Sequence, residues 1–291
     1  MEQIIFILFL LSIGYGLKFL PFPSNFSQSL NLFVIYVSLP ATILVQFPKI
    51  TFNSSLLIPA LIPYLVLILS IVFVRVFFKN ESPNTKAALY LLMALGNTSF
   101  FGFPILQALV GNDAIQYGIV YDQFGSFVIL TIYAAIIVAI FSGESLHFKQ
   151  IGRKIITFPP FIFIFLALVF GEMPQIALPY IELISKTLVP LAIISVGFSM
   201  QLKLDEQKGV FFKFMALKLL LIPMIVFGIF KLFDIGGVVG ITTLLESAMP
   251  PMITAGAIAI NAGFAPKLTA SLVGYGIIFA FFTLSFFNYI F

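Results

Sequence analysis

The sequence predicts an all-α polytopic membrane protein, and three observations support this fold class. Hydrophobic residues make up 61% of the 291 residues and charged residues only 9%, whereas a soluble domain is about 45–50% apolar and about 25% charged. The apolar residues gather in runs of about 20, the length that a helix needs to cross the hydrocarbon core. Two of these runs are interrupted by polar residues, Gly and Pro. The composition therefore excludes a soluble globular domain.

Ten candidate spans follow when the apolar runs are read between charged residues and Pro or Gly breaks. The first span, 2–19, begins with Glu2 rather than a basic segment and lacks a small-residue cleavage site. We therefore expect a retained helix and not a signal peptide. The remaining predicted spans are 26–46, 54–78, 84–109, 114–141, 155–171, 179–201, 210–233, 236–262 and 266–290.

The longest polar connection divides the chain into two halves of five spans, 1–143 and 154–291, joined by a linker at 144–153. Because five is odd, the second half enters the membrane from the opposite side, so any repeat must be inverted. All 15 Lys and Arg residues except three fall at the odd-numbered connections; the exceptions are Lys49, Lys186 and Lys231. The positive-inside rule then predicts a cell (inner) membrane protein with both termini outside and a cytoplasmic central loop.

Weak internal similarity supports two inverted five-helix repeats. Pro40 in the second span matches Pro190 in the seventh at an offset of 150, and Gly125 matches Gly276 at an offset of 151. Single prolines in membrane helices are commonly structural, because neighbouring groups satisfy the backbone that they free. We therefore interpret Pro40 and Pro190 as hinge or scaffold positions.

The fourth and ninth spans are both broken, and we expect function there. Residues 96–104 (GNTSFFGFP) place a polar, helix-breaking insert in the fourth span, and residues 246–251 (ESAMPP) place another in the ninth. Unwound backbone at this depth survives only where protein packs on it or it lines a wet cavity. Corresponding broken helices in inverted halves indicate a transporter's midplane site. We predict that the two breaks cross there.

The predicted crossing offers ligands for a small carboxylate. Half-helix ends present unpaired amides and carbonyls, polar side chains add donors and acceptors, and glycines let a ligand approach the backbone. The predicted substrate-binding residues are Asn97, Thr98, Ser99, Gly102, Pro104, Met249, Pro250, Pro251 and Thr254.

Two acids within spans, Asp122 and Glu246, are predicted to couple transport to H+ or Na+ together with their neighbours Gln123 and Ser247. An ionised carboxylate at this depth is costly, so it must be protonated, paired or holding a cation. The alternative is a structural pair with a basic residue. Lys218 is the only basic residue well inside a span, and we expect its side chain to snorkel to the cytoplasmic end.

Other ligands are not expected. With no Cys and a single His, the chain lacks thiolate or histidine metal sites, so the sequence predicts no metal beyond a possible Na+ near Glu246 and no cofactor. The net charge of +4 reflects basic cytoplasmic loops and not nucleic-acid binding. The expected partners are a small carboxylate and membrane lipids.

The motifs resemble those of a known family. Gly96-Asn97-Thr98-x-x-x-Gly102-x-Pro104, Ala248-Met249-Pro250-Pro251 and Tyr121-Asp122-Gln123 look like a bacterial member of the auxin efflux carrier family, and the resemblance covers essentially the whole chain. Plant members have Pro where this sequence has Gly96 and Gln where it has Pro251. Bacterial relatives are associated with carboxylates such as malate or malonate.

The resemblance implies a scaffold of spans 1, 2, 6 and 7, a mobile transport domain of spans 3–5 and 8–10, an elevator motion and a homodimer. In the family, the asparagine after the first break binds the substrate carboxylate, a role that falls on Asn97. Glu246 also resembles the sodium-site glutamate of the related bile acid:sodium symporters. We therefore expect a secondary transporter and not an enzyme.

Three alternatives remain open. The first is a sodium-coupled symporter of the bile acid type, and the second is a membrane ligand sensor that transports nothing. The third is an intramembrane aspartyl protease built on Tyr121 and Asp122, which needs a second catalytic Asp within hydrogen-bond reach; Asp205 and Asp234 lie near span ends.

Moving a monoanion inward against 100 mV costs about 2.3 kcal/mol, so uptake needs a coupled ion or exchange, whereas efflux does not.

Overall fold

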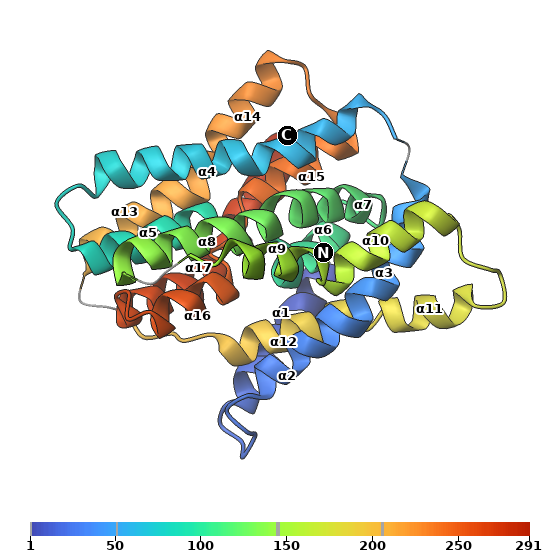
Figure 1. Cartoon of the computed structure of the whole chain (residues 1–291), viewed down its shortest axis with the longest axis horizontal. Helices are drawn as coiled ribbons and strands as arrows, with labels where there is room; N and C mark the ends of the chain where they lie inside the picture. Colours follow the sequence, from blue (N-terminus) through green and yellow to red (C-terminus); the bar gives the residue numbers. More distant parts are fainter. Residues whose placement is uncertain (1, 51, 144–145, 205–206) are drawn as a thin grey trace.

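The protein is helical throughout the part of the chain that the structure, a computed structural model, describes: residues 2–50, 52–143, 146–204 and 207–291. No β-strand occurs within these ranges, and the only extended pairing there is one isolated bridge between Gly96 and Pro251. Figure 1 shows the helices as an elongated bundle.

The helices of the first half follow the predicted spans closely. They are α1 (Glu2–Leu17), α2 (Phe26–Phe33), η1 (Val34–Ser38), α3 (Leu39–Gln46), η2 (Phe47–Lys49), η3 (Ser54–Leu56), α4 (Leu57–Phe77), α5 (Pro83–Ala94), η4 (Thr98–Gly102), α6 (Phe103–Leu109), α7 (Asp113–Val120), η5 (Tyr121–Phe127) and α8 (Val128–Ser142). Of these, η1, η4 and η5 are π-helical turns, and η2 and η3 are 3₁₀ turns.

The second half has the same character. Its helices are α9 (Phe148–Ile156), α10 (Pro159–Phe170), α11 (Leu178–Ser185), α12 (Leu188–Ser199), α13 (Lys208–Ala216), η6 (Leu217–Leu221), α14 (Ile222–Leu232), α15 (Gly237–Ser247), α16 (Ile253–Asn261) and α17 (Pro266–Ile290). The segment η6 is another π-helical turn.

Six helical segments among the described residues are long and apolar enough to cross a membrane, or seven if the bent pair α9 and α10, which meet at 48°, counts as one. This is fewer than the ten predicted spans. The difference comes from short and broken helices: α1 has only 16 residues, and the fourth and ninth predicted spans are each split into two short helices. What the structure establishes is therefore a multi-pass, all-helical membrane protein.

One group of helices comprises α1–α3 and α10–α12, along the bottom centre and the right of Figure 1. Within it, α1 and α12 pack backbone against backbone. A Cβ added at Gly14 would collide with the carbonyl of Ile194, and one added at Gly197 would collide with the carbonyl of Leu11. Small residues that permit such close approach are a common means of holding membrane helices together.

The second group comprises α4–α8 and α13–α17. Its contacts include α4 with α5, η5 and α15, and α17 with α5, α13 and α16. Helices α6 and α7, with η4, lie where the two groups meet, because they contact α1, α3 and α12 as well as their own group. The candidate functional site is built around these border elements.

The predicted linker at 144–153 is only partly a loop. Residues 144 and 145 lie outside the described residues, and α9 begins at Phe148 and continues past the predicted end of the linker to Ile156. Its basic residues Lys149, Arg153 and Lys154 are exposed. The predicted linker therefore overlaps a helix, because the apolar residues of 148–156 recur at helical spacing.

Candidate functional site

The two helix breaks cross and hydrogen-bond to one another. Gly96 and Pro251 form an antiparallel bridge, the Asn97 amide donates to the Pro250 carbonyl at 2.8 Å, and the Met252 amide donates to the Leu95 carbonyl at 2.9 Å. Each break thus supplies partners for backbone groups that the other has freed, which is what unwound backbone in an apolar environment requires.

The first break is shorter than the sequence indicates. The unwound part covers residues 95–97, and helical structure resumes at Thr98 as the π-helical turn η4. Pro104 does not interrupt the helix, since η4 and α6 form one continuous helical segment from Thr98 to Leu109 and Pro104 lies just after its π-helical turn. The prediction that the whole insert 96–104 is unwound is therefore wrong. The second break, residues 248–252, agrees with the prediction, although Glu246 and Ser247 still belong to α15.

The Asp122 side chain joins two π-helical turns. Its Oδ1 accepts hydrogen bonds from the Thr98 hydroxyl at 2.5 Å and the Ser99 hydroxyl at 2.6 Å, and its Oδ2 accepts from the Gln123 amide at 2.6 Å. Asp122 and Gln123 come from η5, whereas Thr98 and Ser99 come from η4. π-helical turns inside α-helices are frequent at functional sites. The polar residues of the first break thus contact the fifth predicted span.

Glu246 lies close to two glycines. A Cβ added at Gly102 would be 2.9 Å from Glu246 Oε2, and one added at Gly118 would be 3.2 Å from Oε1. The side chain is only 1% exposed, yet neither carboxylate oxygen has a hydrogen-bond partner. Buried charge that lacks a partner is costly. Glu246 therefore needs a proton or a cation.

Asp122 and Glu246 both border η4: Asp122 accepts hydrogen bonds from Thr98 and Ser99, and Glu246 faces Gly102. Among the described residues, no Lys or Arg forms an ion pair with either acid. The alternative of a structural acid–base pair therefore has no support within these residues.

Asn97 completes the cluster. Its side chain is 1% exposed, and the amide nitrogen Nδ2 has no hydrogen-bond partner. Gln123 Oε1 is likewise buried and unpartnered. The crossing thus holds a donor and several acceptors with unused capacity, which is uncommon in a folded protein. Such groups can bind an anion through Asn97 and a cation or proton through the acids.

The other predicted site residues are distributed unevenly. Met249, Pro250 and Pro251 are buried at the crossing, and Gly276 packs on Pro251. The Ser247 hydroxyl donates to the Leu244 carbonyl at 2.6 Å. Thr254 is exposed on α16. The structure thus brings the two prolines to the crossing, whereas Thr254 points away from the buried cluster.

The predicted hinge prolines belong to elements whose ends are joined by hydroxyl groups. Pro40 is buried near the start of α3, directly after the turn η1, and Pro190 belongs to α12. Hydroxyl groups join these elements: Ser38 with Thr187 at 2.7 Å, and Thr42 with Ser185 at 3.0 Å. Both contacts flank the short turn between α11 and α12.

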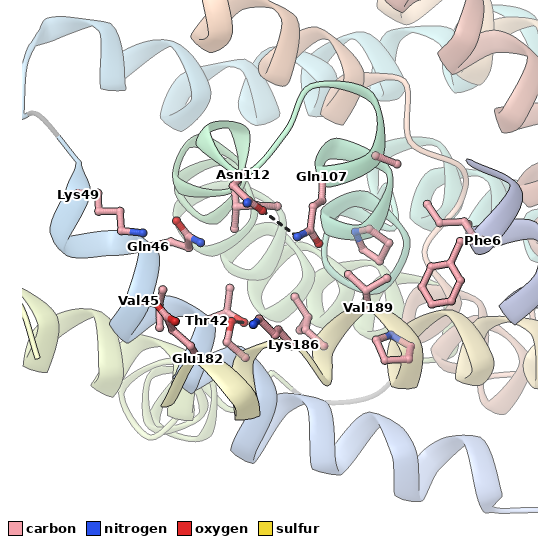
Figure 2. Close-up of a pocket in the computed structure, with 17 residues that line it drawn as sticks. Phe6, Thr42, Val45, Gln46, Lys49, Gln107, Asn112, Glu182, Lys186 and Val189 are labelled. Atoms are coloured by element: carbon pink, nitrogen blue, oxygen red, sulfur yellow. Dashed lines mark hydrogen bonds between the residues drawn. The ribbon is translucent and has the colours of Figure 1, made fainter. Parts of the chain in front are cut away.

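A cavity of about 530 Å³ opens beside this junction. One wall comes from α3, η2 and the α11–α12 turn, and the other from α6 and α7, as Figure 2 shows. Pro104 and Pro190 both line it. No sequence pattern predicts this cavity, because its residues are far apart in the chain. The one related sequence signal is that Lys49 and Lys186 are exceptions to the distribution of basic residues.

The structure also corrects the expectation for Lys218. Its side chain is 1% exposed, within η6, and does not snorkel to a surface. The protein surrounding η6 prevents a buried lysine there from reaching solvent. No described residue provides an ion-pair partner for it.

Residues 1–288 match the family described as membrane transport protein. An uncharacterized transporter of Methanocaldococcus jannaschii is 26% identical over 268 residues, covering 86% of this chain and 85% of that protein. An uncharacterized transporter of Methanothermobacter thermautotrophicus is 24% identical over 282 residues, covering 94% of this chain and 92% of that protein.

Proposed function

The chain belongs to the membrane transport protein family, and we propose that it is a secondary transporter that moves a small organic carboxylate anion by an elevator-type alternating-access mechanism. The substrate class is malate-like, malonate-like or auxin-like. Membership in this family agrees with the resemblance of the sequence motifs to auxin efflux carriers, and both relatives carry the name transporter.

One observation carries the proposal: the amide nitrogen of Asn97 is buried at the crossing without a partner. Leaving a buried donor unsatisfied costs about 1–3 kcal/mol, and binding a ligand at this donor would recover that cost. A carboxylate accepts from such a donor, and the adjacent broken helices add partial charges. Asn97 is therefore the proposed carboxylate ligand.

The proposed architecture is ten membrane helices in two inverted repeats. In it, 1–143 forms the first repeat and 154–291 the second, and the broken fourth and ninth spans cross at the bilayer midplane. The packing of α1–α3 with α10–α12 supports a scaffold of spans 1, 2, 6 and 7. The packing of α4–α8 with α13–α17 supports a transport domain of the remaining spans.

Coupling to H+ or Na+ is proposed to occur at Glu246 and Asp122, with Gln123 and Ser247 beside them. Both acids border η4, and Glu246 has no hydrogen-bond partner. A monovalent cation or proton near them would offset their negative charge and reduce the cost of burial. The proposal also includes a homodimer in the cell membrane with both termini outside, which cross-linking and labelling of single cysteines near each end would test.

A thermal-shift screen tests the function. Purified protein is heated with mono- and dicarboxylates, with and without Na+, at two pH values. A ligand at 100 times its Kd stabilises the native state by about 2.7 kcal/mol. We expect a carboxylate to raise the midpoint of the wild type and of the exposed control Asn25→Ala, but not of Asn97→Ala. A carboxylate that stabilises Asn97→Ala as strongly as the wild type would contradict the assignment.

A sodium-coupled symporter of the bile acid type is the second candidate. The unpartnered Glu246 carboxylate, enclosed by Gly102 and Gly118, favours it because it suits a cation. The same screen separates the two candidates: binding of a steroid anion that requires Na+ supports the symporter, and binding of a small dicarboxylate supports the first proposal.

A further inference from the structure

The cavity beside the α11–α12 turn contains two lysines on the predicted outer side, where basic residues are few. Lys49 and Lys186 both line it, and they are two of the three basic residues that the sequence places on the outer side. Membrane proteins collect Lys and Arg on the cytoplasmic side. Two of the three exceptions thus share one cavity, which the rule for membrane orientation does not explain.

Lys186 also lies within an apolar segment. It occupies the turn between α11 and α12, inside the 22-residue segment Leu178–Ser199 that is long enough to cross a membrane. Ionisable residues within such segments face a protein interior or a water-filled cavity and mark ligand or ion pathways. The position of Lys186 at a turn, on a cavity wall, fits this pattern.

The cavity lining provides ligands for an anion. Figure 2 shows Lys49 and Gln46 on one side, Lys186 beside Thr42, and Gln107 and Asn112 on the facing wall. Neither lysine has a hydrogen-bond or ion-pair partner among the described residues. Among the described residues that line the cavity, Glu182 is the only acid, so the positive charge of the two lysines exceeds its negative charge. A volume of about 530 Å³ lies within the range of about 300–1,000 Å³ for small-molecule sites.

The cavity is connected to the crossing through one helix. Pro104 and Gln107 of α6 line the cavity, and α6 continues from η4, which carries Thr98 and Ser99. The opposite wall belongs to the α1–α3 and α10–α12 group. A ligand in the cavity would therefore contact both groups of helices. The continuous segment of η4 and α6 connects the cavity to the buried cluster around Asn97 and Asp122.

We propose that this cavity is an outer anion-binding site, in which Lys49 and Lys186 bind the carboxylates of a dianionic substrate on the outer face. The identity of the anion rests on the proposed function, whereas the positive potential of the cavity does not. Clefts of one charge with low-dielectric walls concentrate ions of the opposite charge. The two lysines thus determine selectivity for dicarboxylates before the substrate reaches Asn97.

The chain contains no cysteine, so single cysteines report the potential directly. Gln46→Cys places a thiol on the cavity wall, and Ser54→Cys places one at an exposed control position. At each thiol, the reaction rate of a negatively charged, sulfonate-bearing thiosulfonate reagent is divided by that of a positively charged, trimethylammonium-bearing one. We expect this ratio to be about fivefold higher at Gln46→Cys than at Ser54→Cys, because the cavity attracts anions. Adding Lys49→Gln and Lys186→Gln should remove the preference. Ser185→Cys is the second reporter if Gln46→Cys does not fold.

Transport provides the second readout. With malonate or malate supplied at this face, Lys49→Gln and Lys186→Gln should each raise KM about three- to tenfold and change kcat less than about twofold, the result expected when initial binding is lost. Lys231→Gln is the matched control, because this lysine lies on the same predicted face but contacts Phe291. Glu182→Gln should lower KM.

The two readouts separate the two proposals. A preference for the anionic reagent that disappears when the lysines are replaced supports the anion site. If the wild type also fails to transport any carboxylate, that failure overturns the proposed function and leaves the anion site supported. If the reagents react without preference and both lysine variants retain the wild-type KM, the anion site is overturned while transport stands. An equal rise of KM in Lys231→Gln would also overturn it.

Discussion

Replacing Asp122 tests how the two π-helical turns are held together. Its carboxylate accepts three hydrogen bonds, from Thr98, Ser99 and Gln123. Asp122→Ala removes all three acceptor contacts. Asp122→Asn keeps an oxygen for the two hydroxyls, and its amide can donate to Gln123 if that side chain rotates to present its unpartnered Oε1.

The comparison of these two variants isolates the hydrogen bonds, since both remove the charge. At about 1 kcal/mol for each neutral hydrogen bond, Asp122→Ala should be less stable than Asp122→Asn by about 3 kcal/mol. For a protein of this size, 1 kcal/mol corresponds to about 2–4 °C. We therefore expect the midpoint of Asp122→Ala to lie about 6–12 °C below that of Asp122→Asn.

The assay follows from the composition. Because the chain has no Trp, the fraction of protein that remains monodisperse after heating in detergent is measured by size-exclusion chromatography. The exposed Asp113 at the start of α7 provides a matched pair, Asp113→Ala and Asp113→Asn, whose midpoints should differ by less than about 2 °C. Equal midpoints for the two Asp122 variants would refute the network as described.

Three further substitutions test other parts of the structure. Glu246→Gln should retain substrate binding but remove the dependence of uptake on a pH or Na+ gradient in proteoliposomes, because an amide neither titrates nor offsets a cation's charge; unchanged dependence would refute coupling there. Gly102→Ala should destabilise the protein by about 1–3 kcal/mol and slow transport, because its Cβ would lie 2.9 Å from Glu246 Oε2; a wild-type midpoint and flux would contradict the described packing. Gly197→Ala should reduce the yield of folded protein, since its Cβ would collide with the Leu11 carbonyl, whereas Gly228→Ala, which has open space, should be neutral; equal yields would contradict the close packing of α1 and α12.

Much of the helical pattern was predictable because it depends on local composition. The predicted ranges 26–46, 54–78 and 114–141 match continuous helical segments at 26–49, 54–77 and 113–142. Apolar runs and Pro or Gly positions determine such boundaries without knowledge of the fold. The breaks were also predictable, since polar residues inside an apolar run are visible in the sequence. Their extent was not, because Thr98–Gly102 forms a π-helical turn that depends on contacts with η5.

The contacts at the crossing required the tertiary structure. Gly96 and Pro251 are more than 150 positions apart, and nothing local indicates that their backbones pair. The same holds for Glu246 against Gly102 and Gly118. Burial of Lys218 was mispredicted for the same reason: the length of its side chain suggested snorkelling, but the surrounding helices decide whether a path to the surface exists.

The sequence by itself determined the membrane class, most helix boundaries and the polar residues of the two breaks, because hydropathy and backbone propensity act over neighbouring positions. Only the tertiary structure decided which groups satisfy one another. It paired the two breaks, left Asn97 and Glu246 with unused hydrogen-bonding capacity, and brought Lys49 and Lys186 to one cavity. Such arrangements depend on packing between helices distant in the chain, where many contacts together, and no single local preference, select the structure.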